Sequence, residues 1–370
     1  MITKTKLLFA MLAATAPFTV HADKKHDVQQ LKEEAAKSIA KQLQHANFSA
    51  ATSRMLTRQA ISGGDISVPL HDLLADARGT DSSRLGDINR KITATKGLSD
   101  WSQGVLQLRL YLPDRDASRL PAQWKDVLVA VEPSGDESER ASVPAFDAKG
   151  NRHDLDAKTP PRNPVLILDV DGRESGRAGA LLVNHALRRA DMQVRSESEV
   201  QDGAEFTVLS KIRVKDAGED WVRGAAEVFA VISGVQPGET KAQIELKDMS
   251  YLDWWDTDYA PFQDMIAWKN YGLDAANVQL FEQDDWSSYA DIAASIINKV
   301  NTQLPVAAQD PASLSVIGQA VINSIDSGND YIDSFYLIEK KKNYDHLLGA
   351  NNNATASFCF HVVGNSSCRR

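Results

Sequence analysis

The chain has 370 residues, 43% of them hydrophobic, and its 50 acidic residues outnumber its 41 basic ones, for a formal charge of −9. A chain of this length can bury one large core or two smaller ones. The acidic balance argues against nucleic acid as a partner, because phosphate backbones are bound by clustered Lys and Arg.

Residues 1–22 have the pattern of a secretory signal peptide. Two lysines precede an apolar run over residues 7–20, and Val20-His21-Ala22 is a small-x-small cleavage pattern before Asp23. The apolar run is shorter than the roughly 20 residues that span a bilayer. The sequence therefore predicts an exported protein, periplasmic or extracellular, with no transmembrane segment in the mature chain. Loss of the two lysines changes its formal charge from −9 to −11.

Residues 23–200 are predicted to form a mixed α/β region. Apolar residues at spacings of three and four over 27–44 predict a helix that begins at Asp27. Residues 68–74 are typical of a short strand or turn that enters a helix.

The next segments of this region alternate with period two. Residues 105–110 and 127–131 are predicted strands, bounded by Pro, Gly or Asp turns. After the proline-rich linker 160–164, residues 165–171 are typical of a buried strand that ends in an acidic turn, and a helix over 174–189 follows.

The acidic turn Asp169-Val170-Asp171-Gly172 resembles the first motif of haloacid-dehalogenase-type phosphatases. In that family the first Asp is the nucleophile and the second is a general acid. The resemblance implies an alternative function, a secreted hydrolase that uses Asp169 and Asp171, with Asp326 and Asp330 recruited to hold magnesium. A strand that ends in an acidic turn explains the same residues without any chemistry.

Residues 201–370 are predicted to form a mainly antiparallel β-sandwich with inserted helices, so the expected fold class of the whole chain is α+β. The predicted strands are 206–212, 225–232, 242–246, 278–281, 331–338 and 355–362, and the predicted helices are 288–304 and 314–325. Cys359 and Cys368 lie close together at the end of an exported chain, which favours a disulfide that ties the last strand.

The stretch from Glu245 to Asp291 holds eleven acidic residues and only two lysines. Crowded carboxylates raise one another's pKa unless loops spread them into water or a cation gathers them. Calcium is the expected cation, because it takes six to eight oxygens from flexible loops. The alternative is that acidic loops only keep an exported protein soluble. The candidate ligands are Asp216, Glu219, Asp220, Asp248, Asp253, Asp256, Asp258, Glu282, Asp284 and Asp285.

Four of the seven tryptophans, Trp254, Trp255, Trp268 and Trp286, lie in the same stretch. They are a possible platform for sugars or peptides beside the acidic loops. Packing in a core is the commoner role of such side chains.

Two resemblances concern larger parts of the chain. Segments such as Leu106-Gln-Leu-Arg-Leu and Pro164-Val-Leu-Ile-Leu-Asp-Val-Asp resemble an uncharacterised family of exported bacterial proteins, classed as a domain of unknown function. Asp220-Trp-Val-Arg-Gly and Val278-Gln-Leu-Phe-Glu-Gln-Asp-Asp are similar to segments of the calcium-dependent β-sandwich of protein kinase C and synaptotagmin. The second resemblance implies calcium-binding loops, with Glu282 and Asp284 as ligands.

Motifs of common enzymes are missing, including His-Glu-x-x-His, Gly-x-Ser-x-Gly and the phosphate-binding glycine loop. The sequence therefore predicts a binding protein. In this hypothesis calcium orders the acidic loops, and the loops and tryptophans present a surface to a macromolecule or glycan.

Overall fold

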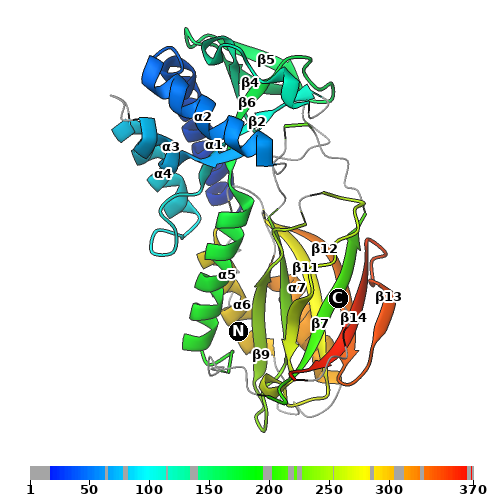
Figure 1. Ribbon diagram of the computed structural model, residues 1–370. Coiled ribbons are helices and arrows are strands. Elements are labelled where there is room, and N and C mark those ends of the chain that lie inside the picture. The colour runs from blue at the N-terminus through cyan, green and yellow to red at the C-terminus, as the bar shows by residue number, and fades with distance from the viewer. Residues whose placement is uncertain are drawn as a thin grey trace, which may run out of the picture.

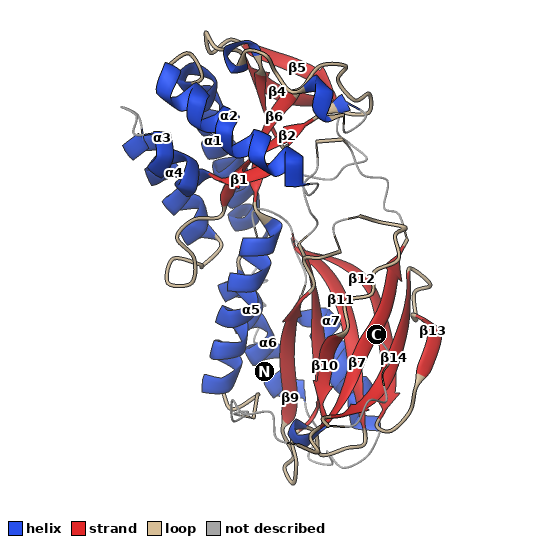
Figure 2. Cartoon of the chain, in the orientation of Figure 1, coloured by secondary structure: helices blue, strands red, loops and turns tan. Residues whose placement is uncertain are grey.

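A computed structural model describes residues 17–62, 66–77, 82–113, 116–133, 141–194, 202–215, 221–222, 227–252, 254–283, 287–303, 312–325, 329–364 and 368. These residues form seven α-helices and fourteen strands in three sheets, so the predicted α+β fold class is confirmed (Figures 1 and 2). Most of the predicted signal peptide, residues 1–16, lies outside the described residues.

The first sheet has six strands in the order β1-β2-β6-β3-β4-β5, and only β3 and β6 run parallel. Four helices from the start of the chain lie on one face of it (Figure 1). The strands are β1 (Ser67–Pro69), β2 (Leu106–Tyr111), β3 (Leu128–Val131), β4 (Ser142–Phe146), β5 (Arg152–Asp156) and β6 (Val165–Val170). The helices are α1 (Pro17–Gln42), α2 (Ala46–Ser62), α3 (Leu70–Ala77) and α4 (Ser82–Thr95).

Helix α1 begins at Pro17, ten residues before the predicted start at Asp27. Proline is favoured in the first turn of a helix, where its missing N–H has no partner to lose. The capping pattern at Asp27 therefore lies inside a longer helix. Helices α2 and α4 were not predicted, because their apolar positions are interleaved with many polar residues.

The second half of the chain is a sandwich of two four-stranded sheets, in the orders β10-β7-β14-β13 and β12-β11-β8-β9. Every pairing in it is antiparallel. The strands are β7 (Glu205–Val214), β8 (Val228–Val235), β9 (Ala242–Asp248), β10 (Gln263–Ala267), β11 (Ala275–Gln283), β12 (Asn329–Glu339), β13 (Tyr344–Leu348) and β14 (Ala354–Val362). The predicted sandwich with inserted helices is thus observed.

Three helices cover the outer face of the sheet that contains β8: α5 (Gly172–Arg189), α6 (Tyr289–Gln303) and α7 (Ala312–Ser324) (Figure 2). Successive side chains of a strand point to opposite faces. In β8, Phe229 and Val231 therefore contact the helices, while Val228, Ala230 and Ile232 face the other sheet. None of the described helices covers the outer face of the sheet β10-β7-β14-β13 (Figure 1).

Candidate ligand-binding site

Six of the ten predicted calcium ligands lie outside the described residues: Asp216, Glu219, Asp220, Asp253, Asp284 and Asp285. Of the other four, Asp256 and Asp258 lie together beside Arg213, while Asp248 and Glu282 lie elsewhere. Asp248, at the end of β9, and Glu282, near the end of β11, flank the start of β8, but their strand positions place them on opposite faces of the sheet. Among the described residues, no group of three or more His, Cys, Asp or Glu side chains is arranged to hold a metal ion.

Asp248 faces helix α5 rather than a loop. Its carboxylate accepts a hydrogen bond from the backbone N–H of Ser250 at 3.0 Å, and it lies so close to Gly176 that a Cβ there would meet it at 2.7 Å. Burial raises the pKa of this carboxyl above its usual value. Asp248 therefore belongs to the packing of α5 on the sandwich.

The predicted tryptophan platform is also divided. Trp268 is buried and its indole N–H donates to the Thr207 hydroxyl at 3.0 Å, while Trp255 packs partly against the sandwich core. Trp254 is 48% exposed on the loop after β9, and Trp286 lies outside the described residues. Trp254 alone among the three described side chains has the exposure that a platform requires.

The predicted disulfide is present between Cys359 and Cys368, whose Cα atoms are 6.0 Å apart. Cys359 lies in β14, paired to β7, so the bridge attaches the end of the chain to a central strand of the uncovered sheet.

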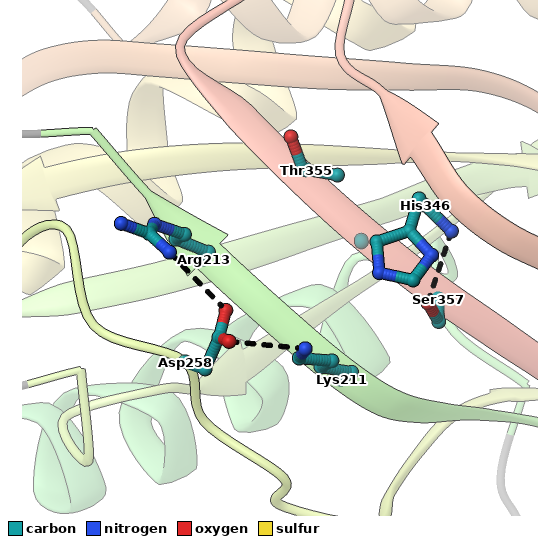
Figure 3. A pocket seen from close by; sticks show the side chains of 7 residues that line it. Lys211, Arg213, Asp258, His346, Thr355 and Ser357 are labelled. Atoms are coloured by element: carbon teal, nitrogen blue, oxygen red, sulfur yellow. Dashed lines mark hydrogen bonds and ion pairs between the residues drawn. The ribbon is translucent and has the colours of Figure 1, made fainter.

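A hollow of about 250 Å³ opens on the outer face of the sheet β10-β7-β14-β13 (Figure 3). Register explains its composition, because Arg213 and Lys211 of β7 lie opposite Thr355 and Ser357 of β14 on the same face. The residues that line the hollow are Lys211, Arg213, Asp258, His346, Thr355, Ala356 and Ser357.

The loop between β9 and β10 brings acids to these cations. The backbone N–H of Asp256 donates to the carbonyl of Val214 at 2.6 Å, and Tyr259 forms an antiparallel bridge with Ile212. Asp256 itself has φ 53°, in the left-handed region that Asp tolerates better than most residues. The loop thus runs along the part of β7 that β10 does not pair with, and it presents Asp256 and Asp258 beside the outward side chains of β7.

Each cation of the hollow is paired with a carboxylate. Arg213 Nε and Nη2 donate to Asp256 Oδ1 at 2.9 and 2.7 Å, and Lys211 Nζ lies 3.0 Å from Asp258 Oδ2. Asp258 also lies 3.8 Å from Arg213. The hydrogen bond from Lys211 lowers the pKa of the Asp258 carboxyl, and the hydrogen bonds that Arg213 donates to Asp256 raise the pKa of Arg213. Two of the predicted calcium ligands therefore have protein cations as partners.

His346 and Ser357 form the opposite wall (Figure 3). The backbone N–H of His346 donates to Ser357 Oγ at 3.1 Å, and Ser357 Oγ donates to Asp345 Oδ1 at 3.2 Å. His346 Nδ1 lies 2.7 Å from the same Asp345 oxygen, and the imidazole is 64% exposed. The serine hydroxyl is thus bonded to a carboxylate and a backbone amide, an arrangement that differs from the serine–imidazole pair of a nucleophilic site.

The sequence contained some signal for this site. Asp256 and Asp258 were predicted ligands, but of a metal. Lys211 and Arg213 alternate with inward residues near the end of a predicted strand, which marks them as outward-facing. His346 and Ser357 carried no signal, since only the pairing of β13 with β14 brings them to β7.

The two acids of the phosphatase hypothesis have other partners. The Asp169 carboxylate is fully buried and accepts from Arg109 Nε at 2.9 Å, and Arg109 Nη2 donates to the carbonyl of Val222 at 2.6 Å. Asp171 caps helix α5 by accepting from the N–H groups of Arg173 and Glu174. Asp330 is exposed on β12, and Asp326 lies outside the described residues.

The fold and the hollow define the chain as an α+β protein with a depression of about 250 Å³ on the outer face of its sandwich. Residues 32–365 match the profile of the family described as "Protein of unknown function (DUF3103)", and the chain belongs to that family. This confirms the predicted resemblance to an uncharacterised family. No curated protein and no solved structure is significantly similar to it. None of the described helices is both long and apolar enough to cross a membrane.

Proposed function

We propose that the protein is an exported binding protein and that the hollow on the outer face of the sandwich is its ligand site. The observation that carries the proposal is the gathering of seven side chains from three strands and a loop around one depression of about 250 Å³. Drug-sized ligands occupy pockets of roughly 300–1,000 Å³. The hollow therefore suits a small group or one unit of a longer ligand.

Binding, rather than catalysis, agrees with the partners of each polar group. The lysine, the arginine and both acids are engaged in pairs, and Ser357 donates to Asp345. A group that attacks a substrate needs a base within hydrogen-bonding reach and a nucleophile directed at the ligand. Paired side chains instead present fixed donors and acceptors, which is what recognition requires.

Export is supported by the amino-terminal pattern and by the disulfide. A signal peptide followed by a Cys359–Cys368 bridge is the combination expected in an oxidising compartment. The calcium requirement, and with it the likeness to calcium-dependent sandwich domains, stays a prediction that depends on the six acids outside the described residues.

A thermal-shift screen tests the binding function without assuming a ligand class. The purified mature chain is melted with neutral oligosaccharides, acidic sugars, phosphate, sulfate, amino acids and short peptides. We expect at least one class to raise the melting temperature of the wild type and not that of the Lys211→Met variant. Asp264→Asn, on the exposed side of β10 and outside the hollow, is the matched control. If no compound shifts the wild type, or if every hit is turned over, the binding function fails.

A further inference from the structure

We infer that the ligand of the hollow is a neutral, polyhydroxylated molecule, that is, a sugar unit of a glycan without acidic groups. This inference rests on the proposed binding function and adds the chemical class of the ligand. It follows from the balance of charge in the hollow, from the mixture of donors and acceptors on its walls and from the exposed ring on the loop beside it.

The charges of the two ion pairs at the hollow cancel each other. Lys211 and Arg213 supply two positive charges, and Asp256 and Asp258 supply two negative ones at distances of 2.7–3.8 Å. Asp345, next to His346, adds a further carboxylate. An anion that approaches the cations meets these acids, and a metal ion that approaches the acids meets the cations. The arrangement therefore disfavours both classes of charged ligand.

The pairs still offer hydrogen bonds. An ammonium group has three donors and a guanidinium five, and each carboxylate oxygen has more than one acceptor site. Lys211, Arg213, Asp258 and His346 are between 41% and 64% exposed, so a ligand reaches them. A sugar hydroxyl both donates and accepts, and it can bond to a cation and to its carboxylate partner at once.

The two walls of the hollow give such a ligand partners on both sides. Figure 3 shows Arg213, Asp258 and Lys211 in a row on one side and Thr355, His346 and Ser357 on the other. The Thr355 hydroxyl is uncharged and can donate or accept, whereas Ser357 Oγ, whose proton is donated to Asp345, offers a ligand only an acceptor. A ring with hydroxyl groups around its edge fits two adjacent polar rows of this kind.

An apolar surface lies on the same loop. Trp254 is 48% exposed and precedes Asp256 and Asp258 by two and four residues. A partly exposed indole adds contact area at small entropic cost, and this side chain favours the C–H face of a sugar over an inorganic ion. At Trp254 the platform for sugars or peptides stays a prediction.

The test compares two probe sets on the same protein. Immobilised cellohexaose, maltohexaose, chitohexaose and mannohexaose are the neutral probes, and hexagalacturonate, inorganic phosphate and inorganic sulfate are the anionic ones. We expect the wild type to bind at least one neutral oligosaccharide and to show no measurable binding of the anions. Lys211→Met removes a donor and a charge, so its Kd for the neutral probe is expected to rise at least about tenfold.

Asp258→Asn is the sharper variant, because it removes the charge that balances Lys211 while the shape of the side chain is retained. We expect this variant to gain affinity for hexagalacturonate and to lose affinity for the neutral probe. Trp254→Ala is expected to weaken neutral binding without creating anion binding. Asp264→Asn is expected to leave both unchanged. Circular dichroism and melting curves on each variant separate a lost ligand from a lost fold.

The possible results distinguish the two proposals. Wild-type binding of anions alone, abolished by Lys211→Met, overturns the neutral ligand class and leaves the binding function in place. Neutral binding that survives Lys211→Met, Asp258→Asn and Trp254→Ala overturns the hollow as the site. Absence of binding to every neutral probe overturns the inference.

Discussion

Asp256 and Asp258 show how a local partner changes the chemistry of a residue. Both were expected to bind calcium. Instead Asp256 is paired with Arg213 and Asp258 with Lys211, and both cations lie on the neighbouring strand β7. A protein cation neutralises a carboxylate as a metal ion does. It also lets the carboxylate remain a hydrogen-bond acceptor for a neutral ligand.

A calcium titration distinguishes these acids from the remaining candidates. We expect the Asp256→Asn/Asp258→Asn variant to bind calcium as the wild type does, because its altered side chains were occupied by cations. Extracellular calcium sites have Kd values of roughly 0.1–1 mM, so isothermal titration calorimetry in that range is the measurement. Weaker binding by the variant would mean that the two acids leave their cations to bind the ion.

The lowered pKa of Asp258 predicts a dependence of stability on pH. The folded-state pKa lies below the usual value of 3.8 because Lys211 donates to the carboxylate. The stabilisation is therefore complete above that value and is lost as the pH falls through the lower, folded-state value. We expect the melting temperature difference between wild type and Asp258→Asn to be constant between about pH 5 and 7 and to shrink below about pH 4. A difference that grows in acid contradicts the assignment.

At the scale of elements, the hairpin of β13 and β14 depends on one buried acid of another strand. Asp333, in β12, is fully buried, and its two carboxylate oxygens accept from the N–H groups of Ser334, Asn351, Asn353 and Ala354 at 2.7–2.8 Å. This carboxylate shapes the turn that leads into Thr355 and Ser357. One wall of the hollow is thus supported from the other sheet.

Replacement of Asp333 is expected to affect stability and the hollow together. Asp333→Asn loses charge-assisted bonds in a buried place, so we expect a loss of roughly 3 kcal/mol in the free energy of unfolding. Chemical denaturation measures it, and ligand binding at a temperature where the variant is folded measures the second effect. Asp330→Asn, exposed on the same strand, is the control. Equal stability of the two variants would refute the role of the turn.

Gly349 is a second residue on which the turn around the Asp333 carboxylate depends. A Cβ at this position would lie 2.2 Å from an Asp333 carboxylate oxygen, closer than real side chains come. Glycine allows the turn backbone to approach the carboxylate closely enough to donate.

In the molecule as a whole, the segment that leads into β8 is bonded at two points, Val222 and Glu227, to residues of the first half of the chain. Arg109 donates a hydrogen bond to the carbonyl of Val222, and its ion pair with the buried Asp169 fixes its position. At the start of β8, Lys96 and Glu227 form an ion pair. Lys96 Nζ lies 3.1 Å from Glu227 Oε2, and both side chains are almost completely buried. Between these points, residues 223–226 lie outside the described residues.

Glu227 has further partners from helices of both halves. Ser175 Oγ and Tyr289 Oη donate to its carboxylate at 3.1 and 3.4 Å. Helix α5 makes room for the Tyr289 ring with Gly179, where a Cβ would lie 2.2 Å from the ring. The hydrophobic core continues through this region, from α1 to the helices on the sandwich, as one cluster. We therefore expect the chain to unfold in a single transition.

A double-mutant cycle tests the contribution of the Lys96–Glu227 ion pair to stability. Removal of one member of a buried ion pair leaves an uncompensated charge and costs roughly 3–5 kcal/mol. Lys96→Met and Glu227→Gln are each expected to show such a loss, and the double variant less than the sum of the two. The exposed pair Lys241–Asp191 is the control and should contribute little. Additive losses for the buried pair would show that the two residues act independently.

Elements with a local sequence pattern could be predicted from the sequence alone. Periodicity along the chain predicted the strands around residues 105–110 and 165–171, the helices near 174–189 and 288–304, and most sandwich strands. Periodicity predicts such elements because it reflects which side chains of each element are buried. The Cys359–Cys368 bridge followed from nearness along the chain and the inferred compartment.

Which acidic and basic side chains form pairs depends on the tertiary structure and could not be predicted from the sequence. Lys211, Asp258 and His346 are far apart in sequence, and the register of β7 with β14 and the path of one loop bring them to the same hollow. Composition records how many acids a stretch contains, but not whether a cation from a distant strand lies beside each one. For that reason the acidic residues pointed to a metal, and folding gave Asp256 and Asp258 arginine and lysine as partners.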